Sequence, residues 1–229
     1  MESRYNRLRR IFDLYDTFCR GLERFCRKGC SLCCTANVTV TGLEAELILD
    51  FWRAKKQALP MAALKTTACQ GRFRPTVTIN RLAEMCARGE DGPDEEADPQ
   101  AGPCPLLKGD LCSIYAVRPF GCRAMQSLSD CRRLGAADMP EWLFSANTLF
   151  LQYIEAADRP GITGNLTDVL LFLAEREKFV PDVEFLRPPA CLPANHSITA
   201  LMIPPEHRGR LQGPARALRE IVADPGPLA

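Results

Sequence analysis

The sequence has few histidines, no long apolar run and almost no excess of charge. Each of these shortages argues against a class of protein or site. The longest purely apolar run, residues 169–174, has six residues, whereas a membrane-spanning helix needs about 20. The first residues, Met1-Glu2-Ser3-Arg4, are followed by no signal-peptide apolar core. The net charge of +1 lacks the basic excess that nucleic-acid and anionic-membrane binding usually require. We therefore expect a cytoplasmic protein whose partners include neither nucleic acid nor a membrane.

The two histidines, His196 and His207, lie in proline-rich sequence far from most of the cysteines. Neither is expected to bind metal, and no Cys-His or Ser-His-Asp arrangement can be argued from their positions. The remaining composition is ordinary for a globular protein, with 46% hydrophobic and 25% charged residues in a chain of 229. This length suits one mid-sized domain, or a small domain with an extension.

Cysteine is the residue type that is unusually frequent. Ten of the twelve cysteines fall between residues 26 and 131. In a reducing compartment, clustered thiols bind metal or carry out redox chemistry more often than they form disulfides. Four cysteines are interpreted instead as small buried apolar residues: Cys19, Cys69, Cys86 and Cys191.

The first half of the chain contains several helix patterns. Apolar residues three and four apart from Tyr5 to Cys26 predict a first helix, which Gly29 would end. The capping-box spacing Thr41-x-x-Glu44 predicts a second helix over residues 42–57. Residues 60–67 are expected to be weakly helical at best, and Thr78 or Asn80 is expected to cap a shorter helix through residue 86. The acidic stretch 89–98 is predicted to be an exposed loop.

The second half is irregular at first and then helical. Residues 103–131 are dense in cysteine, glycine and proline, which predicts short turns and a short strand. A helical apolar pattern follows Pro140, and Asn165 or Thr167 would cap a further helix through Phe179. The last 49 residues hold nine of the eighteen prolines, so we expect an irregular wrap before a short helix that Pro214 opens.

These patterns predict a mainly α fold, with helices packed around an irregular cysteine-rich metal-binding centre. We expect residues 1–135, including the N-terminal helix, to form a cysteine-cluster metal-binding domain. Residues 136–229 are expected to form a helical and proline-rich extension that packs on this domain.

The clustered cysteines form two separated halves of a candidate metal site. The first half is Cys26-x3-Cys30-x2-Cys33-Cys34, in which a tight loop lets two thiolates three positions apart bind one ion. The second half has spacings too wide for an ordinary zinc ribbon and contains Cys104, Cys112, Cys122 and Cys131. Eight cysteines allow one four-sulfur site with spare thiols, two such sites, or a site that shares ligands between two ions.

The adjacent pair Cys33 and Cys34 bears on that choice. Neighbouring side chains in an extended chain point to opposite faces, so both thiols on one tetrahedral ion would need a local contortion. Ligation of different sites, or one ligand beside one buried thiol, is easier.

Arginines accompany the later cysteines. Arg118 and Arg123 flank Pro119 and Cys122, and a guanidinium can donate hydrogen bonds to metal-bound sulfur while offsetting thiolate charge. We expect these two arginines to support the ligands. Arg132 and Arg133 could do the same or be solvated.

Five strings in the chain together resemble a known family. In order they are Cys26-x3-Cys30-x2-Cys33-Cys34, Thr41-x-x-Glu44-Ala45, Pro103-Cys104-Pro105-Leu106, Gly109 to Tyr115, and Arg118-Pro119-x-x-Cys122-Arg123. They resemble the YkgJ-type cysteine-cluster family, described as a zinc- or iron-chelating domain, over about residues 26–131. The resemblance implies metal binding by the motif cysteines, which here are Cys26, Cys30, Cys33, Cys34, Cys104, Cys112 and Cys122, with Cys131 added to them.

A related cysteine cluster in the flagellin lysine N-methylase implies an iron–sulfur centre. The chain is short for that enzyme and has no recognisable glycine-rich nucleotide loop, so methyl transfer does not carry over.

Three functions follow from these residues. We favour a metal-binding protein whose cysteines hold iron–sulfur, with 4Fe–4S slightly preferred, or zinc, in a structural, sensory or metal-handling role. Its partner is then the metal ion or cluster, and no protein partner can be named. A second function is a cluster-dependent oxidoreductase or protein-modifying enzyme, and the third is a metal-free thiol/disulfide redox protein that uses Cys33 and Cys34.

An enzyme is the less favoured interpretation, and if the protein is one we expect an iron–sulfur oxidoreductase. The CxxxCxxC of radical S-adenosylmethionine enzymes is present at Cys26, Cys30 and Cys33. However, a long predicted helix precedes it, and no alternation of strands and helices follows.

Overall fold

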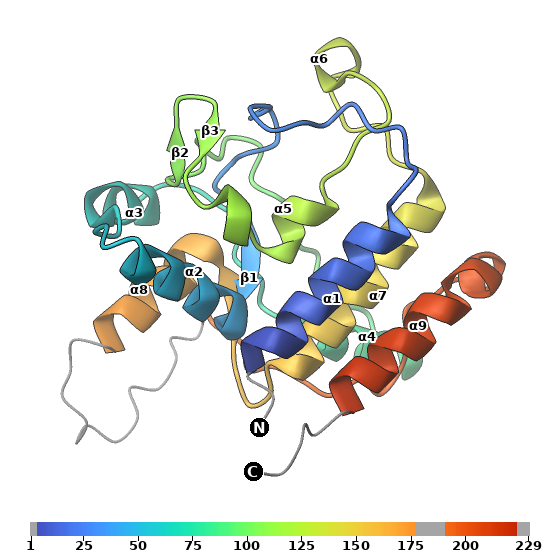
Figure 1. The fold of residues 1–229 in the computed structure, drawn as a ribbon. Coiled ribbons are helices and arrows are strands. Elements are labelled where there is room, and N and C mark those ends of the chain that lie inside the picture. Colours follow the sequence, from blue (N-terminus) through green and yellow to red (C-terminus); the bar gives the residue numbers. More distant parts are fainter. Residues whose placement is uncertain (1–3, 177–190, 224–229) are drawn as a thin grey trace.

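The computed structural model describes residues 4–176 and 191–223. Within these ranges the fold is mainly α, as predicted (Figure 1). The α-helices are α1 (Arg4–Phe18), α2 (Gly42–Ala54), α3 (Met61–Ala68), α4 (Ile79–Ala87), α5 (Phe120–Ala124), α6 (Cys131–Leu134), α7 (Glu141–Ala157), α8 (Leu166–Arg176) and α9 (Arg208–Ala223). The strands are β1 (Thr39–Thr41), β2 (Leu107–Lys108), β3 (Leu111–Cys112) and β4 (Thr163–Asn165), and two 3-10 turns are η1 (Tyr115–Val117) and η2 (Pro205–His207).

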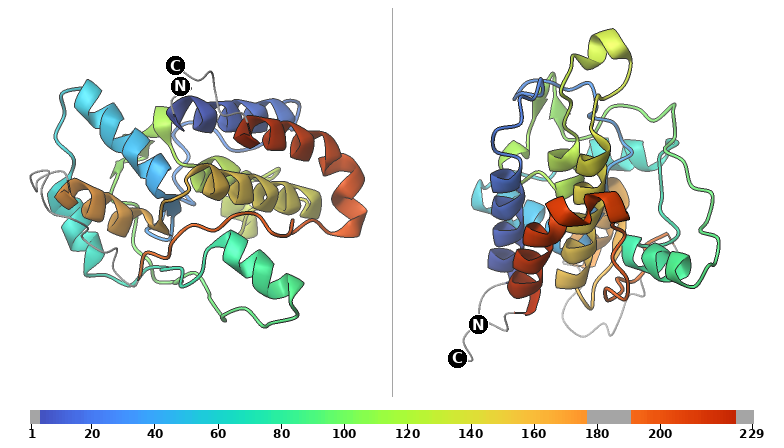
Figure 2. Two further views of the ribbon diagram at one scale, coloured as in Figure 1. Left: turned by 90° about the horizontal axis from the view of Figure 1, so that it is seen from below. Right: turned by 90° about the vertical axis from the view of Figure 1, so that its right-hand side faces the viewer.

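The larger apolar core lies between α1, α7 and α9, which run side by side (Figures 1 and 2). Three fully buried rings form its centre, and Tyr15 meets Phe120 and Phe150 edge-on at centroid distances of 4.7 and 5.0 Å. Because Phe120 begins α5, this core also anchors the start of a short helix that carries a cysteine. Aromatic pairs of this geometry contribute about 0.5–1.5 kcal/mol beyond their buried area.

The first helix is shorter than predicted. It ends at Phe18, not near Gly29, and Gly21 follows in the left-handed region at φ 95°. Cys19 is buried in the core as expected, but Cys26 lies on a loop, where the backbone N–H of Phe25 donates to Ser127 O at 2.8 Å. The apolar spacing continued past the helix end because the loop residue Leu22 still packs on the same core.

A smaller core lies under α2, α3 and α8, and a short antiparallel strand pair holds it together. Strands β1 and β4 pair Val40 with Gly164, although these residues are far apart in sequence. Each strand is followed at once by a helix, β1 by α2 and β4 by α8. The predicted capping box is confirmed at the first of these junctions, where Thr41 and Glu44 bond each other's backbone N–H groups.

Three further helix predictions can be compared with the structure. Helix α2 ends at Ala54, before residue 57, and residues 61–68 form a regular helix where weak helicity was expected, because the buried Leu64 fixes that segment in the smaller core. Thr78 caps α4 by accepting from Arg81 N, and the acidic loop 89–98 is largely exposed, as predicted.

The C-terminal part contains a correction. Helix α9 begins at Arg208, so Pro214 lies inside this helix and does not open it. Prolines 204 and 205 make the preceding turn, and burial of Leu211 and Leu218 stabilises the helix across Pro214. Asn165 caps α8 by accepting from Thr167 N at 3.0 Å, while the predicted end of this helix at Phe179 lies outside the described residues. In the described part of the chain, no helix has both the length and the apolarity that a membrane span requires.

Candidate metal centre

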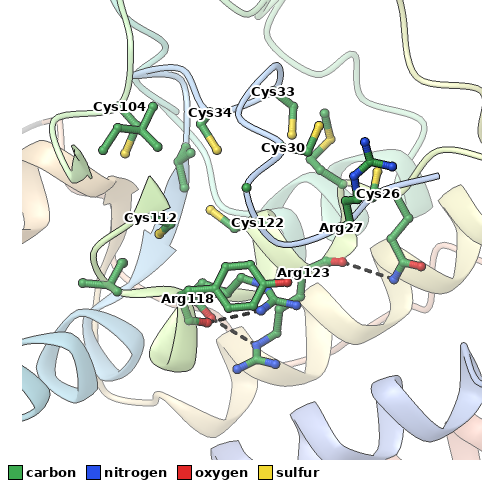
Figure 3. Close-up of a pocket in the computed structure, with 18 of the residues that line it drawn as sticks. Cys26, Arg27, Cys30, Cys33, Cys34, Cys104, Cys112, Arg118, Cys122 and Arg123 are labelled. Atoms are coloured by element: carbon green, nitrogen blue, oxygen red, sulfur yellow. Dashed lines mark hydrogen bonds between the residues drawn. The ribbon is translucent and has the colours of Figure 1, made fainter. Parts of the chain in front are cut away.

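Cysteines from both halves of the sequence pattern surround one cavity of about 350 Å³ (Figure 3). Seven of the eight predicted ligands line it: Cys26, Cys30, Cys33, Cys34, Cys104, Cys112 and Cys122. The eighth, Cys131, is not part of the lining, but it lies near enough to Cys26 for its charge to raise the pKa of that thiol. The described lining side chains include no histidine, aspartate or glutamate, so the cysteine thiols are the main metal-binding donors of the cavity.

The loop between α1 and β1 lies against the segment that enters the β2–β3 hairpin. Cys104 N donates to Cys34 O at 2.9 Å, and Thr35 forms an isolated bridge with Pro103. At the hairpin turn, Ser31 Oγ donates to Asp110 Oδ1 at 2.6 Å. These bonds bring together two halves that are about seventy residues apart in the chain.

The hairpin brings Cys112 back toward Cys104. Its turn contains Gly109 at φ 60°, a conformation that favours glycine. Leu107 then pairs with Cys112, and Ser113 N and Oγ both donate to Leu106 O. Burial raises the pKa of Cys104 to about 11 and also raises the pKa of Cys112, whose rise is opposed by the charge of Arg118.

Cys122 is positioned by a buried carboxylate. Glu44 is 3% exposed, and its Oε1 accepts from Phe120 N at 2.7 Å, while Oε2 accepts from Thr41 N at 2.9 Å. Glu44 thereby joins the start of α2 to the start of α5, which carries Cys122. Burial raises the pKa of Cys122, and the charges of Cys104 and Cys112 raise it further.

Cys33 and Cys34 do not point to opposite faces. The chain turns at this point and is not extended, and both thiols line the cavity. The interaction between the two side chains raises the pKa of Cys33 and lowers that of Cys34. The sequence argument assumed an extended chain here, and the turn replaces it; whether the two thiols bind different sites stays a prediction.

The cysteines sort into two neighbourhoods. The pKa of Cys34 is lowered first by its interaction with Cys33, and the charges of Cys122, Cys104 and Cys112 oppose this fall. The sulfurs of Cys34, Cys104, Cys112 and Cys122 occupy one side of the close-up in Figure 3. Cys33 lies near both neighbourhoods, because its charge also raises the pKa of Cys122. Cys26 has its pKa raised first by burial and then by the charges of Cys33, Cys131 and Cys30. We call the first set the hairpin group (Cys34, Cys104, Cys112, Cys122) and the second the loop group (Cys26, Cys30, Cys33, Cys131).

The thiols are spread around the cavity without converging on a single point. Among the described residues, no three cysteine, histidine or carboxylate side chains form a group that could hold one metal ion. The soft, all-sulfur donor set suits zinc or iron–sulfur and does not suit magnesium or calcium, which prefer oxygen ligands. The cysteines of the cavity therefore fit a thiolate-bound metal, and the spacing of their thiols bears on whether that metal is zinc or iron–sulfur.

The two predicted supporting arginines line the cavity but donate to oxygen. Arg118 donates to Tyr115 O at 3.2 Å and stacks over the Tyr115 ring, and Arg123 donates to Arg118 O at 3.1 Å and to Asp16 at 3.4 Å. In the described residues neither guanidinium has a hydrogen bond to a cysteine sulfur. Their contribution to the cavity is therefore positive charge.

Sequence reasoning missed several residues of the cavity wall. Val38 and Leu166 form part of it, and they meet because Leu166 N donates to Val38 O at 2.8 Å beside the β1–β4 pair. No local pattern could have linked these two residues. Arg27 and Tyr115 also line the cavity, and their positions next to Cys26 and between Cys112 and Arg118 were an available signal.

The other cysteines and the histidines lie outside the cavity lining. Cys69 and Cys86 are exposed, which corrects the prediction that they are buried, because the ends of α3 and α4 leave them in solvent. His196 N donates to Glu155 Oε1 at 2.6 Å, and His207 Nδ1 lies 2.8 Å from Ser145 Oγ.

Comparison with known proteins identifies the family. No curated protein and no solved structure matches the chain significantly. Residues 25–142 match the model of the CxxCxxCC family, described as a proposed zinc- or iron-chelating domain. This range covers the whole cysteine constellation and about half of the chain. The protein therefore belongs to the CxxCxxCC family of cysteine-cluster metal-binding domains.

Proposed function

We propose that the protein holds two iron–sulfur clusters, one on the hairpin group and one on the loop group, and serves in redox chemistry or sensing. The observation that carries the proposal is the open arrangement of the thiols around a cavity of about 350 Å³. Two groups of four also match the four thiolates that a 4Fe–4S cluster takes.

The size of the cavity supports clusters over single zinc ions. A zinc ion draws four sulfurs to about 2.3 Å, so that they lie about 3.8 Å from one another. Here the described thiols do not converge in threes. A cubane needs a wider arrangement because each thiolate binds a different iron atom.

The neighbourhoods of the thiols support the division into two groups. The sulfurs of Cys34, Cys104, Cys112 and Cys122 lie on one side of the close-up in Figure 3, whereas the charges of Cys30, Cys33 and Cys131 raise the pKa of Cys26. Adjacent Cys33 and Cys34 then serve different clusters, which is the assignment that sequence reasoning found easier.

The surrounding residues suit negatively charged clusters, which would supply one-electron chemistry when bound. Arg24, Arg27, Arg118 and Arg123 line the cavity, and their positive charge offsets the thiolates. Val38, Ile114 and Leu166 provide apolar wall, which limits water near the sulfurs. All twelve cysteines are free thiols, so a reducing compartment such as the cytoplasm suits the proposal.

The test is to purify the protein without oxygen and measure visible absorption together with iron, sulfide and zinc per chain. Two clusters predict absorption near roughly 400 nm and about eight iron and eight sulfide per chain. Cys112→Ser and Cys30→Ser should each lose about half of the iron, whereas Cys86→Ser, at an exposed position, should lose none. About four iron atoms would contradict the two-cluster assignment, and a colourless zinc protein would contradict iron–sulfur altogether.

A second candidate, thiol/disulfide redox chemistry without metal, is favoured by the adjacent pair Cys33 and Cys34, whose thiols both line the cavity at a turn of the chain. Titration of free thiols in the denatured, metal-free protein separates the two functions. Metal ligands return as thiols, whereas a disulfide lowers the count by two.

A further inference from the structure

Large apolar side chains are exposed at one end of the molecule, around the cysteine cavity. In the described residues, those with the greatest exposure are Phe25, Leu32, Leu111, Met125, Leu128, Leu134 and Phe144. They belong to the loop after α1, the β2–β3 hairpin, the segment around α6 and the first turn of α7. The first three of these segments lie together at the end of the fold opposite both termini (Figure 1). We call this surface the cysteine face.

The same surface is strongly basic. Residues 20–34 and 104–135 together carry nine lysines and arginines against three acidic residues, a net charge of +6, whereas the whole chain carries +1. Four of these arginines line the cavity. The other five basic residues are exposed and have no ion pair within the described structure: Arg20, Lys28, Lys108, Arg132 and Arg133.

Apolar residues interspersed with unpaired charge are the pattern of an interface and not of a solvated surface. Isolated exposed leucines are common on proteins, but exposed apolar residues gathered at one end of a fold are typical of a binding surface. Leu111 and Leu134 are 55% and 58% exposed. Leu111 is adjacent to Cys112, and Leu134 lies two residues after Arg132. An apolar centre with a charged rim is typical of protein–protein interfaces.

We propose that the cysteine face is a docking surface for an acidic protein that exchanges electrons or metal with the cavity beneath it. The identity of what is exchanged rests on the proposed function, but the docking itself does not. The basic residues without ion pairs favour a partner surface of opposite charge, and the exposed aliphatic side chains favour apolar groups on that partner.

The composition of the surface favours a protein over a nucleic acid. Single-stranded nucleic acids bind to aromatic platforms on which bases stack, whereas four of the seven exposed apolar residues are leucines. Leucine offers nothing to a phosphodiester backbone. The proposed contact is also close to the cavity, because Leu32 adjoins Cys33 and Leu111 adjoins Cys112, and both cysteines line the cavity.

The test uses the full-length, metal-loaded protein with a photo-crosslinking residue at position 111 or 134, and at position 219 on α9 as the control. Crosslinking in cells of the source organism, followed by titration of the purified captured partner, should identify an acidic protein at 111 and 134 only. Its affinity should fall about tenfold or more in Arg132→Glu with Arg133→Glu, and also between about 50 and 300 mM salt. Arg216→Glu with Arg219→Glu, a matched pair of exposed arginines on α9, should leave the affinity unchanged.

Three outcomes overturn the proposal: equal crosslinking at 111, 134 and 219; a partner that binds the Arg132 and Arg133 variant normally; or capture of nucleic acid or lipid in place of a protein. Iron and zinc are measured in every sample. A partner that binds specifically to a protein without iron would refute the iron–sulfur assignment alone, while iron-loaded protein without a partner would refute docking alone.

Discussion

Glu44 is predicted to control metal binding from outside the cavity lining. Its carboxylate accepts three hydrogen bonds, from Phe120 N, Thr41 N and Thr41 Oγ1, at 2.7, 2.9 and 3.0 Å. Glu44→Ala leaves two buried backbone N–H groups without an acceptor, each at a cost of about 1–3 kcal/mol. Relief from burying a carboxylate, whose pKa burial raises, offsets part of this loss. We expect a net destabilisation of about 2–4 kcal/mol.

The same change should weaken metal binding, because Phe120 begins the helix that carries Cys122. Glu44→Gln keeps one acceptor oxygen, so it should lose about half as much stability and retain more metal. Urea unfolding under reducing conditions measures the stability, and competition with a chelator measures metal retention.

A second buried carboxylate provides the control. Glu155 is 1% exposed and also accepts from two backbone N–H groups, those of Asn80 at 2.8 Å and His196 at 2.6 Å. It lies outside the cavity lining. Glu155→Ala should therefore destabilise the protein to a similar extent while leaving metal retention in the folded protein unchanged. Equal metal loss in the Glu44 and Glu155 variants would refute the positioning role of Glu44.

Three other changes have defined outcomes. Cys30→Ser should lower both metal content and melting temperature because metal binding and folding are coupled, while Cys69→Ser changes neither; retained metal and unchanged melting would remove Cys30 from the ligand set. Burial raises the pKa of Asp158 from 3.8 to about 7, so the folded state keeps a proton that the unfolded state releases between these pH values. Stability should therefore fall by up to about 4 kcal/mol as the pH rises from 4 to 7, and urea unfolding of Asp158→Asn should show a flatter dependence. Tyr15→Phe removes a buried hydroxyl that donates to Asn147 at 2.7 Å and should cost about 1–3 kcal/mol, whereas a loss below about 0.5 kcal/mol would contradict this account.

Sequence patterns correctly predicted the features that depend on contacts between residues close together in the chain. The capping box of Thr41 and Glu44 is confirmed because both partners lie within one helical turn. The helix after Pro140 is also confirmed, since its apolar face packs along its length in the larger core. The mainly α fold was predicted from these helix patterns, and the family was predicted from the cysteine motifs.

Features that depend on distant contacts were not predictable in the same way. The spacing from Tyr5 to Cys26 could not reveal that Gly21 ends the helical region early and that Ser127 holds Phe25 in a loop. Pro214 resembles a helix start in sequence, but burial of neighbouring side chains keeps it inside α9. The turn at Cys33 is closed by Cys34 N donating to Ser31 O, but the bond from Cys104 N to Cys34 O that joins this turn to the second half of the site spans about seventy residues.

The β1–β4 pair has a consequence for the order of events during synthesis. One wall of the cavity consists of Val38 and Leu166, which are joined beside this pair. Every clustered cysteine leaves the ribosome before Leu166 does, since the last of them is residue 131. The nascent chain thus exposes its thiols before the enclosure that protects them can close. Closure of the metal site should accordingly follow emergence of Leu166, and reducing conditions matter most to the newborn protein.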